Sequence, residues 1–174
     1  MGWQTKKMEE FSREELLSLI ETLAKNWLAL DGVWFQAVEK SYGLEAALEM
    51  DYQAWRRYSG LETKRLMSWL GLPEGEGIIG LRQVLQIRPQ SRVNRFEIMT
   101  PDDNTLIYCL KECRVQAARK RAGLPDHPCK PVGIAEYEEL ARAVDPRLTV
   151  RCMFCPPDPH PEGYWCAWEF KLEE

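Results

Sequence analysis

Apolar residues recur every three or four positions through most of the first 70 residues, which is the spacing of one face of a helix. Ser12 followed by Glu15 is a capping box, in which each side chain accepts from the other's backbone amide. Tyr42-Gly43 separates two such stretches. We therefore expect helices to fill most of residues 12–70, arranged as a helical hairpin.

From residue 92 the apolar positions instead alternate with polar ones, as in strands with one buried face. Two alternating segments flank the turn at 101–104, and two more flank the proline-rich stretch at 156–163. The pattern predicts strands near 92–100, 105–111, 148–155 and 164–172, and helices near 114–122 and 134–144.

The predicted fold class is therefore α+β. We expect a single domain over residues 1–174, with a helical N-terminal arm at 1–90 and an α+β half at 91–174 that holds two antiparallel hairpins with intervening helices. A composition of 45% hydrophobic and 29% charged residues is typical of a folded protein.

Charge and hydropathy exclude several classes of partner. With 23 basic and 27 acidic residues the chain carries a net charge of −4, so we do not expect nucleic-acid binding through phosphates. No apolar stretch has the roughly 20 residues that cross a bilayer, and no secretory signal is recognisable, so we expect a cytoplasmic protein without a membrane partner. Seven tryptophans and a long amphipathic arm predict a homodimer, because they offer more apolar surface than one small domain covers.

Six cysteines lie in the C-terminal half, and in a reducing compartment they favour metal binding over disulfides. If the last hairpin is symmetric about its loop, Cys152 lies opposite Cys166, and Cys155 follows at the loop edge. Three thiolates in this arrangement favour a structural zinc site. The fourth ligand is either Cys129 or His160, and an iron–sulfur cluster is the alternative to zinc.

The region from Cys129 through Arg151-Cys152-Met-Phe-Cys155 to Tyr164-Trp-Cys166-Ala-Trp-Glu-Phe170 resembles the 4-vinyl reductase-type domain, a small-molecule-binding fold. The resemblance implies a zinc ion held by Cys129, Cys152, Cys155 and Cys166, with Cys152 in place of the family's usual acidic ligand. The helical first half and Cys113 are also similar to the 2-amino-thiazoline-4-carboxylate hydrolase-like group.

Three functions follow from these features. The first is a stand-alone domain that binds an apolar or aromatic small molecule, with Trp34, Tyr108 and Trp168 as candidate walls and Asp31 as a polar group facing the cavity. Asp31 has a structural alternative, a helix kink or an ion pair with an arginine.

The second function is an enzyme of the hydrolase-like group, in which Asp31, Glu62 and Cys113 would converge. A buried, unreactive Cys113 and an ion pair between Glu62 and Arg65 are the structural alternatives. The third function is a zinc-stabilised interaction protein that uses its helical arm as the partner surface. The sequence leaves open whether any reaction is catalysed.

Overall fold

A computed structural model describes residues 6–174 of the chain, which fold as a helical hairpin followed by a sheet with helices between its strands. After a short 3-10 turn, Met8–Glu10, the hairpin consists of α1, Arg13–Tyr42, and α2, Leu44–Leu70. Gly43 joins the two helices with a φ of 90°, a backbone conformation that side chains with a Cβ disfavour. The predicted helices and hairpin are confirmed.

The predicted capping box at the start of α1 is also present. The Glu15 amide donates to Ser12 Oγ at 3.2 Å, and the Ser12 amide donates to Glu15 Oε2 at 2.7 Å. Two of the orphan amides at this helix end are thereby satisfied.

Four strands form one antiparallel sheet in the order β1-β2-β4-β3. Their bounds are Arg95–Asp102 for β1, Thr105–Glu112 for β2, Leu148–Phe154 for β3 and Cys166–Leu172 for β4. The remaining helices are α3, Gly77–Ile87, α4, Gln90–Val93, α5, Arg114–Arg121, and α6, Lys130–Val144. The α+β fold class is confirmed.

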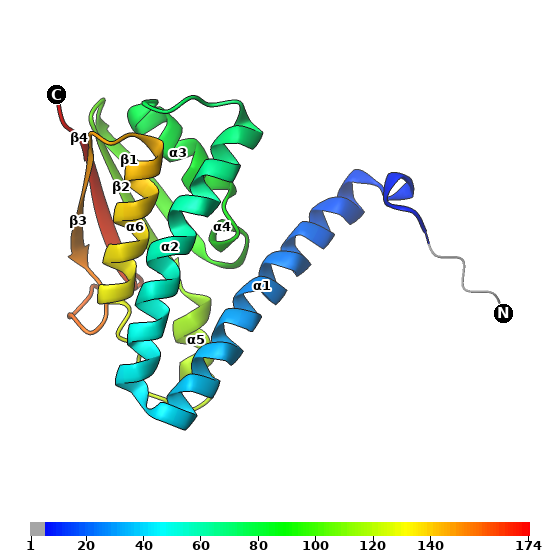
Figure 1. Cartoon of the computed structure of the whole chain (residues 1–174), viewed down its shortest axis with the longest axis vertical. Helices are drawn as coiled ribbons and strands as arrows, with labels where there is room; N and C mark the ends of the chain where they lie inside the picture. The colour runs from blue at the N-terminus through cyan, green and yellow to red at the C-terminus, as the bar shows by residue number, and fades with distance from the viewer. Residues whose placement is uncertain (1–5) are drawn as a thin grey trace.

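The helices cover one face of the sheet. In Figure 1, α6 lies across this face, α2 packs along α6, and α3 closes the upper end. The opposite face carries ion pairs between neighbouring strands, such as Lys111 with Glu97 and Arg151 with Glu169. The sheet thus has one buried and one solvated side, as is common for antiparallel sheets. Because α2 packs on α6, the helical arm and the α+β half share one core.

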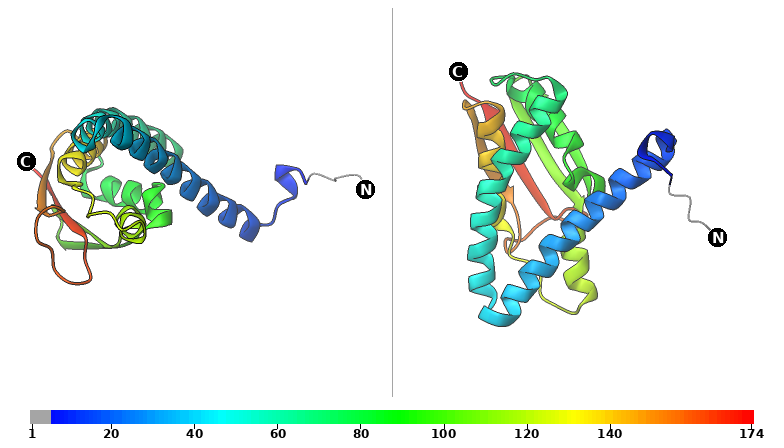
Figure 2. Two further views of the ribbon diagram at one scale, coloured as in Figure 1. Left: turned by 90° about the horizontal axis from the view of Figure 1, so that it is seen from below. Right: turned by 45° about the vertical axis from the view of Figure 1, so that its right-hand side comes forward.

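The N-terminal half of α1 leaves this body. Figures 1 and 2 show the helix packing at its C-terminal end and extending away from the other elements toward its N-terminal end. Its residues Ile20 and Leu23 are 50% and 55% exposed. Among the described helices, α1 included, none is long and apolar enough to cross a bilayer.

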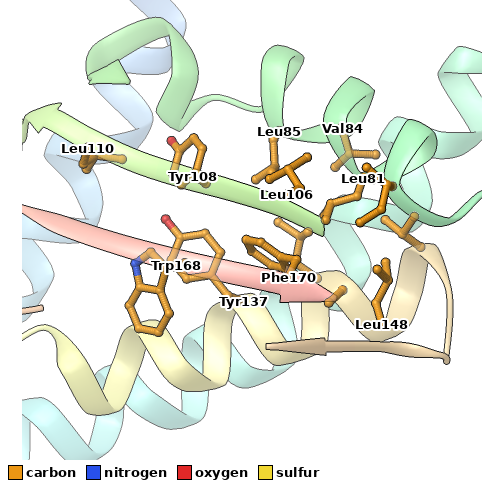
Figure 3. Packing of buried hydrophobic residues seen from close by; sticks show 14 of the residues in the cluster. Leu81, Val84, Leu85, Leu106, Tyr108, Leu110, Tyr137, Leu148, Trp168 and Phe170 are labelled. Carbon is orange, nitrogen blue, oxygen red and sulfur yellow. The ribbon is translucent and has the colours of Figure 1, made fainter. Parts of the chain in front are cut away.

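The apolar core lies between the sheet, α3 and α6. Figure 3 shows Leu81, Val84 and Leu85 of α3 facing Leu106 of β2 and Phe170 of β4. All five of these side chains are fully buried. Burial of such side chains contributes roughly 1.5–3 kcal/mol each, so this end of the sheet anchors the fold.

The predicted register of the last hairpin is wrong. Cys152 lies opposite Trp168, and Val150 lies opposite Phe170, so the two strands are shifted by two positions from the symmetric pairing. A bulge between Cys152 and Phe154 then brings Phe154 opposite Ala167. Cys166 is instead opposite Leu110 of β2. The loop connects the strands asymmetrically, because the Trp165 amide already donates to the Leu110 carbonyl at 2.8 Å.

Helix α6 begins four residues earlier than predicted, at Lys130, directly after Cys129. The sequence suggested a loop because Pro131 follows. However, proline is tolerated in the first turn of a helix, where its missing amide would have no intrahelical partner.

Candidate functional site

A cavity of about 390 Å³ opens between α1, the first half of α2, α5, the start of α6 and the inner face of the sheet. Its volume lies in the range of small-molecule sites. On the α1 wall, Leu28, Ala29, Phe35 and Gln36 surround Gly32, and a Cβ added to Gly32 would meet no atom within 4 Å. The glycine therefore leaves open space at the centre of this wall.

The floor of the cavity is built from β2, β4 and α6. Tyr108, Trp168 and Tyr137 form it, and the Tyr137 ring packs 4.7 Å from that of Trp168. Gly133 of α6 allows this packing, because a Cβ there would lie 2.6 Å from Trp168 Cζ2. The indole position is therefore fixed by the absence of a side chain on α6.

Several buried polar atoms around the cavity have no hydrogen-bond partner among the described residues. They are Gln90 Oε1, Tyr108 Oη, His127 Nδ1 and Trp168 Nε1. An unpaired buried polar group costs about 1–3 kcal/mol, so native proteins rarely retain several in one place. Here they come from four different elements or loops and lie around a single cavity.

Two carboxylates and an imidazole lie at the α1–α2 wall. Asp51 is 5% exposed, and its Oδ2 lies 3.8 Å from Nε2 of His127. Burial, followed by the negative charge of Asp51, raises the pKa of Asp31 to about 6, while the nearby His127 opposes the shift. The His127 ring packs edge-on against Phe35 at 4.7 Å.

The segment that carries His127 is held by Gln116 of α5. The Gln116 side chain accepts from the His127 amide and donates to the His127 carbonyl, both at 2.8 Å. These two hydrogen bonds fix the backbone at the point where the chain enters the cavity wall, so the imidazole is positioned by α5.

A buried ion-pair network borders the cavity on another side. Arg88 is fully buried and pairs with both Glu62 and Glu136 at 2.8 Å. Burial raises the pKa of Glu136 to about 7, and the Arg88 charge acts in the opposite direction. The sequence had suggested Arg65 as the partner of Glu62, and this is wrong: Arg88 binds Glu62 through two nitrogens.

Four thiols also line the cavity: Cys113, Cys129, Cys155 and Cys166. Hydrogen bonds to the side chains of Cys129 and Cys166 raise the pKa of the Cys155 thiol. The Lys130 amide donates to the Pro156 carbonyl at 2.9 Å, which holds Cys129 beside this group. Burial, followed by the charge of Cys129, raises the pKa of Cys113 to about 12, so the thiol is protonated rather than activated.

Three of the four predicted zinc ligands, Cys129, Cys155 and Cys166, line the same cavity. The fourth, Cys152, lies on β3 opposite Trp168. His160 packs against Trp165 in the exposed hairpin loop. Within residues 6–174, no group of three or more Cys, His, Asp or Glu side chains is arranged to hold a metal ion. Zinc binding therefore stays a prediction, and Cys113 is a further candidate for the fourth ligand.

Comparison with known proteins places the chain in a family. A family model matches residues 8–172. The chain belongs to this family, which is described as Family of unknown function (DUF6125). No curated protein matches the chain.

Of the four predicted ligand-binding residues of this DUF6125 chain, Asp31, Tyr108 and Trp168 line the cavity. Trp34 does not. It is 46% exposed and lines a separate groove between α1 and α2. Asp31 borders both spaces, and within residues 6–174 it forms no ion pair with an arginine, the partner that the structural alternative requires.

Several cavity residues were not identified from the sequence, notably Asp51, His127 and Glu136. Asp51 and Glu136 lie on predicted helices that carry many other carboxylates, and His127 lies in a proline-rich loop. For the two carboxylates the one local signal is a polar residue among apolar positions of a helix, which does not identify the partner in space, and the loop sequence around His127 carries no such signal.

Proposed function

We propose that this protein binds a small molecule with an apolar or aromatic body in the cavity between its helices and its sheet. The observation that carries the proposal is the convergence of four unpartnered buried polar atoms on one cavity of about 390 Å³. Ligand pockets combine apolar walls with a few placed polar groups. A ligand would supply the missing partners and remove their desolvation penalty.

The aromatic walls favour a flat or ring-containing ligand. Phe35, Trp55, Tyr108, Tyr137 and Trp168 all border the cavity. Aromatic pairs in offset or edge-to-face contact contribute about 0.5–1.5 kcal/mol beyond the area that they bury. A ligand ring would extend the existing series of contacts between Tyr108, Tyr137 and Trp168.

Gly32 provides the test. The uncharged fluorescent dye N-phenyl-1-naphthylamine should show saturable binding to the native protein, and Gly32→Phe should abolish this binding by filling the cavity. Gly32→Ala is the matched control, because its Cβ meets no atom within 4 Å. Unchanged dye binding by Gly32→Phe, with its circular dichroism spectrum intact, would contradict the proposal.

An enzymatic role has less support. Glu62 is occupied by Arg88, and Cys113 is held in its protonated form, so the three candidates Asp31, Glu62 and Cys113 do not form an activated nucleophile.

Self-association is the second function that a specific observation favours, and we propose that two copies pair through α1. Six apolar residues of α1 alternate at intervals of four and three, which is the spacing of a coiled-coil seam. They are Leu16, Ile20, Leu23, Trp27, Leu30 and Trp34, and are called the α1 stripe below.

The α1 stripe is complementary to itself. In an antiparallel pair, Leu16 lies opposite Trp34, Ile20 opposite Leu30, and Leu23 opposite Trp27, so every stripe residue has an apolar partner. The row that flanks the stripe on one side, Leu19, Asn26 and Val33, carries no charge that would be buried. This self-complementarity supports a second copy of the chain as the partner of the α1 stripe.

The structure supplies a matching shape. A groove of about 410 Å³ lies where the stripe meets α2, lined by Trp27, Leu30, Trp34, Trp55 and Tyr58. The protruding half of α1 offers Leu16 and Ile20 at the other end of the same stripe. Antiparallel pairing would insert these aliphatic side chains of each copy into the tryptophan-lined groove of the other.

Sedimentation velocity at micromolar concentration tests this pairing. The native protein should sediment as a dimer, and Ile20→Glu should sediment as a monomer because it buries a charge in the seam. Thr22→Glu, which adds the same charge at an exposed position outside the α1 stripe, should remain dimeric. A native monomer at these concentrations, or a dimer that survives Ile20→Glu, would overturn the pairing.

A further inference from the structure

We infer that the ligand of the cavity carries a protonated amine, which Asp31 and Asp51 receive at the α1–α2 wall. This inference rests on the proposed small-molecule binding and adds the chemical class of the ligand. Its basis is a difference between these two carboxylates and the other buried carboxylates of the chain.

Every other strongly buried carboxylate among the described residues forms an ion pair with an arginine. Glu62 pairs with Arg88 at 2.8 Å, and Asp145 pairs with Arg147 at 2.8 Å. Asp51 is as buried as Glu62, at 5% exposure, yet within residues 6–174 neither Asp51 nor Asp31 pairs with a lysine or an arginine. A buried charge is stable in a protein only when it is compensated. The α1–α2 wall therefore has a negative charge excess that calls for a cation.

His127 supplies this compensation incompletely. Its Nε2 lies 3.8 Å from Asp51 Oδ2, which is beyond hydrogen-bonding distance, and its Nδ1 has no partner among the described residues. The two hydrogen bonds to Gln116 hold the His127 backbone, and the ring packs edge-on against Phe35 at 4.7 Å. A closer approach of the ring to Asp51 would therefore disturb its contact with Phe35.

An ammonium group fits the site better than a metal ion does. Asp31, Asp51 and His127, all among the described residues, do not form a group arranged to hold a metal ion. An ammonium has three donors and can bridge two carboxylates that come from different helices. Asp31 borders the cavity from α1 and Asp51 borders it from α2, so an amine between them would replace the missing arginine.

Two arginines on the α5 side of the cavity offer an alternative, the binding of an anionic ligand. Arg114 and Arg121 of α5 also border the cavity, whereas Arg119 is engaged by Glu39 at 3.1 Å. An anionic ligand would use Arg114 and Arg121 instead. The experiment must therefore separate a cation at the α1–α2 wall from an anion at α5.

Three probes of similar shape make this separation: 2-phenylethylamine, 2-phenylethanol and 3-phenylpropanoate. Titration calorimetry with the native protein should show the amine binding about tenfold more tightly than the alcohol, as expected for one charge-assisted hydrogen-bonded pair. Asp51→Asn and Asp31→Asn should each bring the amine within about threefold of the alcohol. Asp103→Asn, a change at an exposed turn carboxylate, should leave the preference intact.

Each outcome separates the inference from the proposed function. Equal binding of all three probes, abolished by Gly32→Phe, would overturn the amine assignment and leave small-molecule binding standing. Preferential binding of 3-phenylpropanoate would also overturn it and point to α5. No binding of any probe would contradict both. Two aspartate variants are used because Asp31→Asn retains a soluble, folded comparison if Asp51→Asn fails to fold.

Discussion

The two ends of the β2–β4 pair are built from the same strands but in opposite ways. At the α3 end, Leu106 and Phe170 are fully buried against aliphatic side chains (Figure 3), and the buried carboxylate nearby, Asp145, is paired with Arg147 and the Gly77 amide. At the α5 end, Tyr108 and Trp168 are equally buried, but each has a polar atom without a partner and faces a cavity.

The difference indicates that the two ends of the sheet have different roles. Close packing gives stability at the α3 end, whereas unfilled space and unpaired polar groups cost stability at the α5 end. Proteins retain such costs where a ligand or a metal later compensates them. The following changes should separate the two ends, beginning with the largest expected effect.

Substitution of the cavity cysteines should have the largest effect on the stability of the α5 end. If Cys129, Cys155 and Cys166 bind zinc, Cys155→Ser should remove one equivalent of metal and lower the free energy of unfolding by on the order of 5 kcal/mol, because the binding energy of a structural zinc contributes to folding. Elemental analysis and urea denaturation would measure the two effects together.

Two further variants identify the fourth ligand. Loss of zinc in Cys152→Ser but not in Cys113→Ser would support the ligand set implied by the resemblance to the 4-vinyl reductase-type domain. The reverse result would support Cys113 as the fourth ligand. Cys109→Ser is the control, since Cys109 lies opposite Glu97 and is not among the residues that line the cavity. A native protein without zinc would refute the metal prediction.

Truncation of one leucine at each end compares the packing directly. Leu81→Ala, in the filled core, should lower the free energy of unfolding by about 4 kcal/mol, because a cavity replaces close-packed atoms. Leu28→Ala, on the cavity wall, should cost about 2 kcal/mol, since part of its side chain already faces open space. Equal losses in urea denaturation would show that the cavity end is packed as tightly as the core.

The smallest expected effect is an increase in stability, caused by Asp31→Asn. Because burial raises the pKa of Asp31 to about 6, the folded protein binds more protons than the unfolded chain between about pH 4 and 6. The contribution of Asp31 to stability therefore falls as the pH rises through this window and stays low above it. Asp31→Asn should raise the free energy of unfolding by roughly 1–3 kcal/mol at pH 7.5 and by about zero at pH 4.

Thermal denaturation of Asp31→Asn at these two pH values would check whether the substitution raises or lowers stability. A variant less stable than the native protein at pH 7.5 would show that the carboxylate is compensated in the free protein. Together with weaker amine binding, the expected gain would mark Asp31 as a residue that lowers stability for the sake of a ligand.

Local pattern was sufficient to predict the hairpin helices, α5, α6 and the four strands, but not α4, whose residues Arg92 and Val93 were assigned to the first strand. The Ser12–Glu15 cap, the helical spacing up to Leu70 and the alternation from residue 92 each depend on neighbours within a few positions. Strand pairing is different, because a bulge beside Cys152 and the hydrogen bond from Trp165 to Leu110 decide the register. Neither feature has a signature in the hairpin sequence.

The site was predicted in part for the same reason. Asp31, Tyr108 and Trp168 were identified because they interrupt or strengthen an apolar pattern. Glu62 was assigned the nearest arginine on its own helix, whereas its partner Arg88 is 26 residues away. Long-range compensation of charge is a property of the folded chain and not of any segment.

The close approach of Gly133 to Trp168 has a consequence for how sequences of this family can change. A Cβ at position 133 would overlap the indole ring, so alanine there requires a smaller ring or an aliphatic side chain at position 168. The two positions should therefore substitute together among relatives. Such paired changes would reshape the cavity floor and let one scaffold adapt to ligands of different size.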